Sequence, residues 1–381
     1  MDFSTHFHPV GFDKGKMVAQ MRRRDLSGVL LTSPENVFYT SGYTALPSSG
    51  NPILYTLRNR LPFFSYVDGD GLVTLLCWGF SAMGVDFGAD DVIGFNDYAG
   101  ALQSLGDLLR RKLGDGGRLG IESTCPYYVL QLLDETLWPR PPVTVADDIL
   151  AALRLIKSPA EIELLKKSTE IIETTVAELY NVLYLGMSRI DLTREAKYRM
   201  IKNGAMGISH ITFSFAQANP EVAIGEKLES GRLATLDLGG IYEGYCSDNR
   251  RYAYAGPVPE SLNERYGVMV GIVDEVGAML RPGTSYAQVF QRAVDLYAEH
   301  NISLLGRFNH VGHNIGLETE ERWIDDDPET RVEEGMVINI ELYSMAETGE
   351  MIGNEETYVV EAAGPTRISV LPREIRPVGG S

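Results

Sequence analysis

The chain has 381 residues, of which 44% are hydrophobic and 23% charged, and its formal net charge is −18. This length favours two domains, and the composition is ordinary for a globular protein. The negative charge excludes nucleic acid as a partner, since nothing would offset repulsion from the phosphates. We expect no membrane span or signal peptide, because no apolar run approaches ~20 residues and no basic segment opens the chain. The three cysteines are widely spaced, which fits a reducing cytoplasm.

Short apolar strands alternate with helical patterns in the first part of the chain, from about residue 18 to residue 145. The expected elements are strands at 28–32, 72–77 and 118–122, a short element at 34–39, and a helix at 101–113. Alternation of this kind predicts an α/β domain. Prolines preclude regular structure at 138–142, so we place the domain boundary near there, at residue 150.

Longer helices mark the second part of the chain. Ser158 is a good N-cap, with Pro159 at the first helical position and Glu161 at the third, so a long amphipathic helix is expected at 160–185. The remaining expected elements are helices at 190–203, 259–280 and 286–300, and strands at 211–216, 233–238, 245–254, 335–343 and 354–361.

A first hairpin, over residues 233–254, carries two aspartates. Asp237 is the one charge in an apolar strand, and Asp248 lies on the return strand. If residues 240 and 245 pair across a four-residue loop, Asp237 lies directly opposite Asp248. Their Cβ atoms would then be ~5 Å apart on one face of the sheet. Two like charges placed so are destabilising unless a cation lies between them.

A second hairpin repeats this arrangement near the C-terminus. Glu341 follows the apolar run Val337–Ile340, and Glu355 lies on the return strand after a turn at 346–350. Pairing residue 345 with residue 351 sets Glu341 opposite Glu355. A one-residue slip would separate either pair. Most acidic residues lie on solvated faces, but two such pairs after core-like strands favour metal binding.

Two histidines supply nitrogen donors to complement these carboxylates. His310 and His313 lie within four residues of one another, next to Gly312 and Gly316, which let the backbone approach a site. Four carboxylates and an imidazole suit Mn, Co, Fe(II) or Zn and include no soft sulfur. Five ligands with potentially bridging carboxylates suit two divalent ions ~3.5–4 Å apart. The metal ligands predicted on this basis are Asp237, Asp248, His313, Glu341 and Glu355.

The order of these motifs resembles the pita-bread metallopeptidase family, which includes methionine aminopeptidase, aminopeptidase P, prolidase and creatinase. The matching motifs are Asp-x10-Asp, Gly-His-x-Ile-Gly, Gly-Met-Val-x-x-x-Glu and a final Glu-Glu-Thr. Residues 154–162 also resemble the interdomain helix of prolidases, and Pro34-x-Asn36-x-x-Tyr39 resembles the creatinase-type N-terminal domain. The resemblance implies an α/β domain over 1–150 and an α+β pita-bread catalytic domain over 151–381, in which helices cover a curved antiparallel sheet.

The same resemblance implies roles for individual residues. Asp237 would bind one metal ion, His313 and Glu341 the other, and Asp248 and Glu355 would bridge the two or complete their shells. A metal-activated water would attack a polarised carbonyl, with Glu341 moving the proton. Relatives with this N-terminal domain are usually homodimers, and we expect the same here.

Three departures from the family pattern concern residues that handle the peptide. Glu320 stands where peptidases carry a histidine, seven residues after His313. The second family histidine would fall at about Ile224, after the segment 216–220, and Gly353 replaces a common arginine. His310 stands three residues before His313 rather than four. We therefore expect His310 to serve catalysis and substrate binding, and Glu320 and Trp323 to contact substrate.

Three functions remain open on this basis. The leading one is a hydrolase of Xaa-Pro dipeptidase or aminopeptidase P type, acting on a short peptide or an analogous C–N bond. The second keeps the metals but acts on a small non-peptide substrate, as a creatinase-type amidohydrolase or a dimethylsulfoniopropionate lyase. An acidic, aromatic pocket with Glu320 and Trp323 would suit such a cationic substrate. The third is a non-catalytic binding scaffold, against which the complete ligand set argues.

Overall fold

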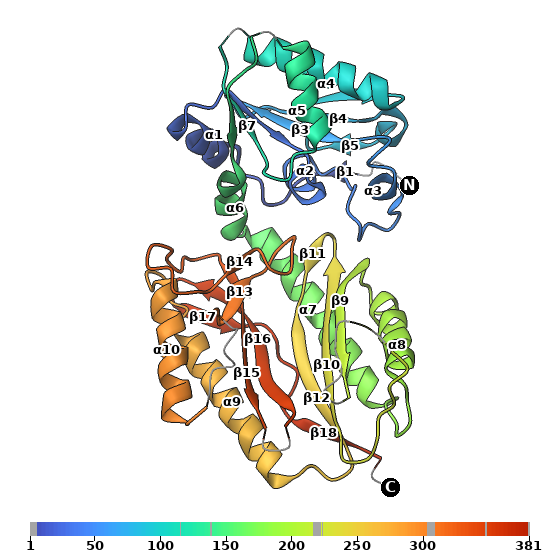
Figure 1. Cartoon of the computed structure of the whole chain (residues 1–381), viewed down its shortest axis with the longest axis vertical. Helices are drawn as coiled ribbons and strands as arrows, with labels where there is room; N and C mark the ends of the chain where they lie inside the picture. The colour runs from blue at the N-terminus through green and yellow to red at the C-terminus, as the bar shows by residue number, and fades with distance from the viewer. Residues whose placement is uncertain are drawn as a thin grey trace. The chain divides into compact units, whose positions relative to one another are not determined.

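The computed structural model describes residues 6–114, 116–137, 139–215, 222, 224–302, 309–346 and 349–379. The chain divides into two compact units, Met1–Arg154 and Leu155–Ser381, drawn blue to green and green to red in Figure 1. The division falls in helix α6 (Asp147–Leu155). Several residues used above lie outside the described parts, namely Trp138, the segment 216–220 and the turn residues 347–348.

The first unit is built on a six-stranded mixed sheet in the order β6-β4-β3-β2-β7-β8. Its strands are β2 (Gly28–Leu31), β3 (Phe64–Asp68), β4 (Val73–Trp78), β6 (Asp91–Phe95), β7 (Leu119–Ile121) and β8 (Val143–Val145). Its other elements are β1 (His6–Phe7), β5 (Asp86–Phe87), α1 (Lys14–Arg23), α2 (Pro34–Ser41), α3 (Ile53–Thr56), the short helix η1 (Gly79–Ala82), α4 (Tyr98–Leu113) and α5 (Tyr127–Thr136). Strand β8 pairs with β7, so the proline run before it lies inside this unit.

The α/β prediction for this unit is confirmed, and its physical basis is burial on both faces of the sheet. All four residues of β2 are buried, as expected for a strand covered on both sides. Helix α4 packs Leu105, Leu108 and Leu109 into the core that Leu30 and Phe64 share. The spacing of these leucines is that of one helical face.

The second unit contains two five-stranded sheets. The first holds β9 (Gly207–Ser214), β10 (Leu233–Tyr242), β11 (Tyr245–Cys246), β12 (Asn249–Ala255) and β18 (Ile375–Val378). The second holds β13 (Gly312–Asn314), β14 (Arg322–Trp323), β15 (Val337–Met345), β16 (Met351–Glu361) and β17 (Gly364–Arg367). Neighbouring strands are antiparallel except for the parallel pair β12 and β18.

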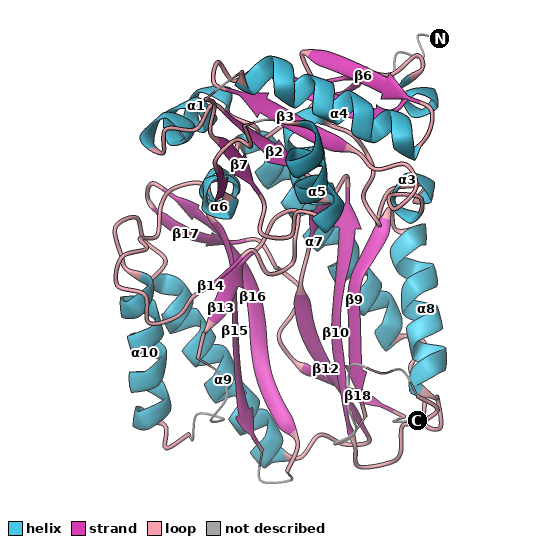
Figure 2. Cartoon of the chain, turned by 45° about the horizontal axis from the view of Figure 1, so that its top comes forward, coloured by secondary structure: helices cyan, strands magenta, loops and turns pink. Residues whose placement is uncertain are grey.

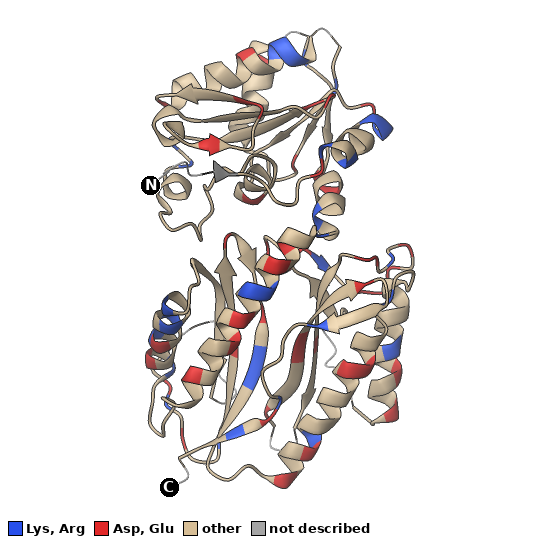
Figure 3. Ribbon diagram, turned by 180° about the vertical axis from the view of Figure 1, so that it is seen from behind, with Lys and Arg blue, Asp and Glu red and all other residues tan. Residues whose placement is uncertain are grey.

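Helices cover one side of these sheets (Figure 2). They are α7 (Pro159–Tyr180) and α8 (Arg189–Lys202) on the first sheet, and α9 (Glu260–Ala278) and α10 (Tyr286–Glu299) on the second. The predicted capping box of α7 is present, because Ser158 Oγ accepts from Glu161 N and the Glu161 carboxylate accepts from Ser158 N. Charged residues recur along these helices (Figure 3). No helix in the described residues is long and apolar enough to cross a membrane.

Strand alternation decides which side chains face the helices. Leu236 and Leu238 of β10 pack into the core beneath α7 and α8. Ile338 and Ile340 of β15 do the same beneath α9 and α10. The alternate residues, including Asp237 and Glu341, therefore project from the opposite face of each sheet. The sheets meet where Gly353 N donates to Tyr252 Oη at 2.9 Å and Arg251 Nη1 donates to the Glu355 carbonyl at 3.2 Å.

Candidate metal centre

The second hairpin has the predicted register. Glu341 lies directly opposite Glu355 in the β15–β16 ladder. His313 on β13 lies opposite Asn339 of β15. Residues 339 and 341 share a face, because they are two apart on one strand. His313, Glu341 and Glu355 therefore project from the same side of this sheet.

The predicted register of the first hairpin is wrong by two residues. Asp237 lies opposite Arg250, and Tyr242 pairs with Tyr245. The loop holds two residues rather than four, since Glu243 (φ 48°) and Gly244 (φ 88°) both adopt positive φ. Two-residue hairpin turns of this kind match the twist of the strands. Because the shift is even, Asp248 keeps the face that was expected for it.

The candidate ligands form two adjoining groups that share Asp248. In one group the donor atoms of His210, Asp237 and Asp248 all lie within 4.8 Å of one another. In the other, those of Asp248, His313 and Glu355 do so. Glu341 belongs to neither group, and its Oε2 accepts a 2.5 Å hydrogen bond from Tyr343 Oη.

His210 is a site residue that the sequence analysis missed. It lies on β9 opposite Gly239 of β10. A Cβ atom at Gly239 would lie 2.6 Å from His210 Cε1, so the glycine makes room for the imidazole ring. The expected position, Ile224, is 43% exposed, and its carbonyl accepts from Ile190 N. In the sequence, His210 shows only that it directly precedes the strand expected at 211–216.

The two imidazoles are held against Asp248. His210 Nε2 lies 3.1 Å from Asp248 Oδ1 and 3.2 Å from Asp237 Oδ1, and His313 Nε2 lies 3.5 Å from Asp248 Oδ2. Burial disfavours the charged imidazole, but the neighbouring carboxylates outweigh it and raise the pKa of His210 and of His313. Burial also disfavours a charged Asp248, yet both histidines together lower its pKa.

Glu355 is buried among other carboxylates. Burial raises its pKa well above the ordinary value, and the charges of Asp248, Asp237 and Glu341 raise it further. Its Oε1 accepts from Asn339 Nδ2 at 3.1 Å, whereas its buried Oε2 has no hydrogen-bond partner among the described residues. Clustered carboxylates with an unsatisfied oxygen are expected where a cation binds. This donor set fits divalent metal ions.

The predicted catalytic and substrate residues lie beside this cluster. His310 Nδ1 is 4.0 Å from Glu341 Oε1, and the His310 ring stacks on Trp323 with 3.9 Å between centroids. The rings of Trp323 and His313 also pack edge to face, with 5.6 Å between their centroids. Glu320 is exposed, and its charge adds to those that raise the pKa of His313.

Arg250 is a second residue that the sequence analysis missed. Its Nη2 pairs with Asp237 Oδ2, and its guanidinium carbon lies 4.2 Å from the centre of the Tyr343 ring. At Gly353, where relatives often carry arginine, an added Cβ would overlap the Leu342 carbonyl oxygen. The sequence thus has an arginine close to the candidate ligands, but on a different strand from the expected one.

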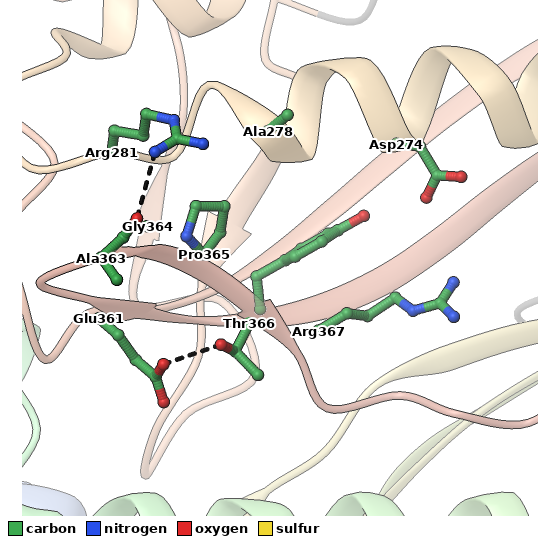
Figure 4. Close-up of a pocket in the computed structure, with 10 residues that line it drawn as sticks. Asp274, Ala278, Arg281, Glu361, Ala363, Gly364, Pro365, Thr366 and Arg367 are labelled. Atoms are coloured by element: carbon green, nitrogen blue, oxygen red, sulfur yellow. Dashed lines mark hydrogen bonds between the residues drawn. The ribbon is translucent and has the colours of Figure 1, made fainter.

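A separate cavity of about 350 Å³ lies between α9 and the β16–β17 hairpin (Figure 4). None of the candidate metal ligands lines it. Its charged lining consists of Asp274, Arg281, Glu361 and Arg367. Arg281 Nη1 donates to the Ala363 carbonyl, and Thr366 Oγ1 donates to Glu361 (Figure 4). These contacts brace the hairpin and lie apart from the metal centre.

Comparison with known families gives two matches that together span most of the chain. Residues 163–362 match the model of metallopeptidase family M24. Residues 15–156 match the creatinase/prolidase N-terminal domain. The first match alone covers more than half of the 381 residues and includes every candidate metal ligand.

Individual relatives agree with these matches. The Xaa-Pro dipeptidase of Pyrococcus horikoshii is 27% identical over 372 residues, covering 94% of this chain and 97% of that protein. The Xaa-Pro dipeptidase of Pyrococcus furiosus is 27% identical over 369 residues, covering 94% of this chain and 98% of that protein. The prolidase structure from Thermococcus sibiricus shares the fold, with a TM-score of 0.82 at 21% identity over 96% of this chain and 98% of that one. The chain therefore belongs to metallopeptidase family M24 and is a metal-dependent hydrolase.

Proposed function

We propose that this chain hydrolyses the Xaa-Pro bond of short peptides, as the names of its relatives describe for them. The observation that carries the proposal is the pair of ligand groups joined through Asp248. The relatives favour a peptidase over a creatinase-type amidohydrolase, a dimethylsulfoniopropionate lyase or a non-catalytic scaffold.

The proposed metal ligands are the five residues first singled out, together with His210. His210, Asp237 and Asp248 would hold one divalent ion, and Asp248, His313 and Glu355 the other. We place Glu341 beside the second group, where it can complete the coordination. When bound, such ions polarise a carbonyl and lower the pKa of water. Carboxylate and imidazole donors suit manganese, cobalt, iron or zinc.

Glu341 is the proposed proton carrier. Burial raises its pKa, although His313 and Tyr343 oppose the shift, and a raised carboxyl pKa suits general acid–base catalysis near neutral pH. The Tyr343 hydroxyl fixes Oε2, so that Oε1 remains on the side of His310. Burial and the charge of His313 lower the pKa of His310. The neutral imidazole of His310 can therefore accept a proton or a substrate hydrogen bond.

Trp323 and Glu320 are the proposed substrate contacts. The Trp323 ring, held against His310, offers a flat apolar wall for the ring of a proline residue. Glu320, exposed and three residues before Trp323, offers a carboxylate to the amino group of the substrate. We also propose that the protein is cytoplasmic and forms a homodimer. Light scattering of the purified chain would test the dimer.

Two measurements test the proposed function. Metal analysis after purification without chelator should find divalent ions, and a chain that binds none would refute the metal centre. A panel of Xaa-Pro dipeptides, assayed with Mn²⁺ or Co²⁺ added, should include substrates. A matched panel of Xaa-Ala dipeptides and small osmolytes should not, and turnover of osmolytes alone would replace the peptide assignment.

Glu341→Gln separates the chemical step from metal binding. The variant should lose activity while retaining most of its metal, because a glutamine amide oxygen can still complete the coordination but cannot carry a proton. Trp323→Ala should chiefly raise KM for Xaa-Pro substrates, because its proposed contact is made in the bound state. Unchanged KM in that variant would remove Trp323 from the proposed pocket.

A further inference from the structure

The β13–β14 hairpin carries two residues of the proposed active site, but its two strands are held differently. His313 on β13 lies opposite both Asn339 of β15 and Trp323 of β14, so β13 is an inner strand of its sheet. Strand β14 has two residues and forms the edge of that sheet in the described part of the chain. Two residues supply few backbone hydrogen bonds, so the position of Trp323 depends on the loop that leads into β14.

That loop, residues 315–321, is organised around the carboxylate of Glu321. Glu321 Oε1 accepts from Leu317 N at 3.1 Å, and Glu321 N donates to the Asn314 carbonyl at 2.9 Å. A Cβ atom added at Gly316 would overlap Glu321 Oε1, so the backbone of the loop passes close around this side chain. Glu321 therefore fixes the end of the loop, two residues before Trp323.

The other oxygen of Glu321 is bound by a lysine from a distant part of the sequence. Lys157 Nζ lies 2.7 Å from Glu321 Oε2, and the two side chains are 1% and 7% exposed. Lys157 directly precedes Ser158, the N-cap of α7, and its backbone N donates to the Gly335 carbonyl at 2.9 Å. An ion pair buried to this degree is weakly screened by salt, and removing one partner leaves the other charge uncompensated. Lys157 therefore links the loop to the start of α7.

We propose that Lys157 and Glu321 form a positioning pair, which holds the loop so that Glu320 and Trp323 face the substrate. The inference rests on the proposed function, because these two residues are its proposed substrate contacts. Lys157 acts on them only through Glu321. His313 is held independently by the pairing of β13 with β15, so metal binding should not depend on the pair.

Kinetics of the full chain with Mn²⁺ and an Xaa-Pro dipeptide test the proposal. Lys157→Met removes the charge while keeping a similar side-chain length. It should lower kcat/KM by about 10- to 100-fold, as displaced contacts do. The loss should come chiefly from a higher KM, because the affected contacts bind the substrate. Calorimetric titration should give the metal affinity of the parent chain. A lower kcat at unchanged KM, or a lower metal affinity, would overturn the proposal.

The double variant Lys157→Met with Glu321→Gln separates lost positioning from a buried unpaired charge. It removes both charges of the pair together. If the bond between them positions the loop, the double variant should raise KM no further than Lys157→Met alone, because both break the same interaction. A KM restored to the parent value, or two independent effects that multiply, would overturn the proposal. If Lys157→Met fails to fold, the double variant serves in its place and should show the same raised KM.

Lys112→Met is the matched control. Lys112 Nζ also lies 2.7 Å from a carboxylate oxygen, that of Asp68, and this pair belongs to the first unit. The substitution therefore removes the same charge from a similar pair, whereas every candidate metal ligand and substrate contact belongs to the second unit. KM should remain that of the parent chain. A rise as large as that of Lys157→Met would assign the effect to the lost charge and overturn the proposal.

Hydrogen exchange separates this inference from the proposed function, since it needs no substrate. The amides of Leu317, Glu321 and Ile324 all donate within the hairpin and its loop. Lys157→Met should speed their exchange by about 10-fold while the amides of β15 keep their rates, because only the loop loses support. Unchanged exchange in the loop would overturn the role of the pair. A parent chain that hydrolyses no Xaa-Pro peptide, but whose loop responds as expected, would refute only the proposed function.

Discussion

The two halves of the candidate metal centre use the same strand geometry but balance their charge differently. On the β15–β16 side, Glu355 is supported by a neutral amide from Asn339. On the β10–β12 side, Asp237 is paired with the charged Arg250. Both hairpins direct acidic side chains to one face, so topology alone makes the halves look equivalent. The residue next to each carboxylate therefore decides its charge balance, although the two hairpins share one geometry.

Removing Asp248 should break both halves at once, because it is their only common member. We expect Asp248→Ala to lower metal affinity by more than the roughly 10- to 100-fold cost of losing an outer partner. Its kcat/KM on an Xaa-Pro peptide should fall to background. Asp274→Ala is the matched control. It removes an aspartate of α9 that pairs with Arg373 and belongs to neither ligand group. Full activity in Asp248→Ala would refute the site.

Removing Asn339 should weaken the β15–β16 half alone. Asn339 is fully buried and touches the centre through Glu355. Asn339→Leu should lower the metal affinity of the Asp248–His313–Glu355 group by about 10- to 100-fold. Calorimetric titration measures this directly. An unchanged metal affinity would contradict a supporting role for Asn339.

Filling the space at Gly239 should damage the β10–β12 half of the centre. The added Cβ of Gly239→Ala would lie 2.4 Å from the Ser247 carbonyl oxygen and 2.6 Å from His210 Cε1, so the backbone beside Asp248 and the imidazole must shift. We expect a loss of roughly 1–3 kcal/mol in the free energy of unfolding, as for other overpacked sites, and weaker metal binding to the His210–Asp237–Asp248 group. Gly271→Ala, on α9 with open space around it, should be neutral or slightly stabilising. Equal effects of the two substitutions would contradict this account.

A substitution in the turn of the first hairpin should have the smallest effect on stability. Glu243 is exposed and has a φ of 48°, which costs an ordinary residue about 1 kcal/mol. Glu243→Asn should recover part of this, because asparagine tolerates that conformation. Denaturant unfolding should show a higher midpoint, with metal binding unchanged. A lower midpoint would argue against the two-residue turn.

The two hairpins also show what a sequence can and cannot specify. Register was predictable for β15–β16, where the apolar run before Glu341 fixes the buried face. The register of β10–β12 was not predictable. Glutamate is uncommon at positive φ, so Glu243 does not indicate a two-residue turn, and the same sequence also suits a four-residue loop. The helices α7 to α10 were predicted because capping residues and apolar spacing are local. The capping box of Ser158 and Glu161 is an example.

His210 and Arg250 could not be found in this way, because their roles depend on contacts between distant strands. His210 lies near Asp237 only because β9 pairs with β10 and Gly239 lacks a side chain. Arg250 meets Asp237 only in the observed register, two residues from the expected one. Periodicity specifies which face a side chain takes, but not which residue of a neighbouring strand it meets.

The position of Asp248 in both ligand groups has a consequence for how the centre fills. In the proposed two-ion centre, each ion would withdraw charge from a carboxylate that the other ion also uses, so the two binding events would be thermodynamically linked. Linkage is reciprocal, and each ion changes the affinity of the other by the same factor. A dissociation constant measured for either ion therefore describes the chain only at a stated occupancy of its neighbour.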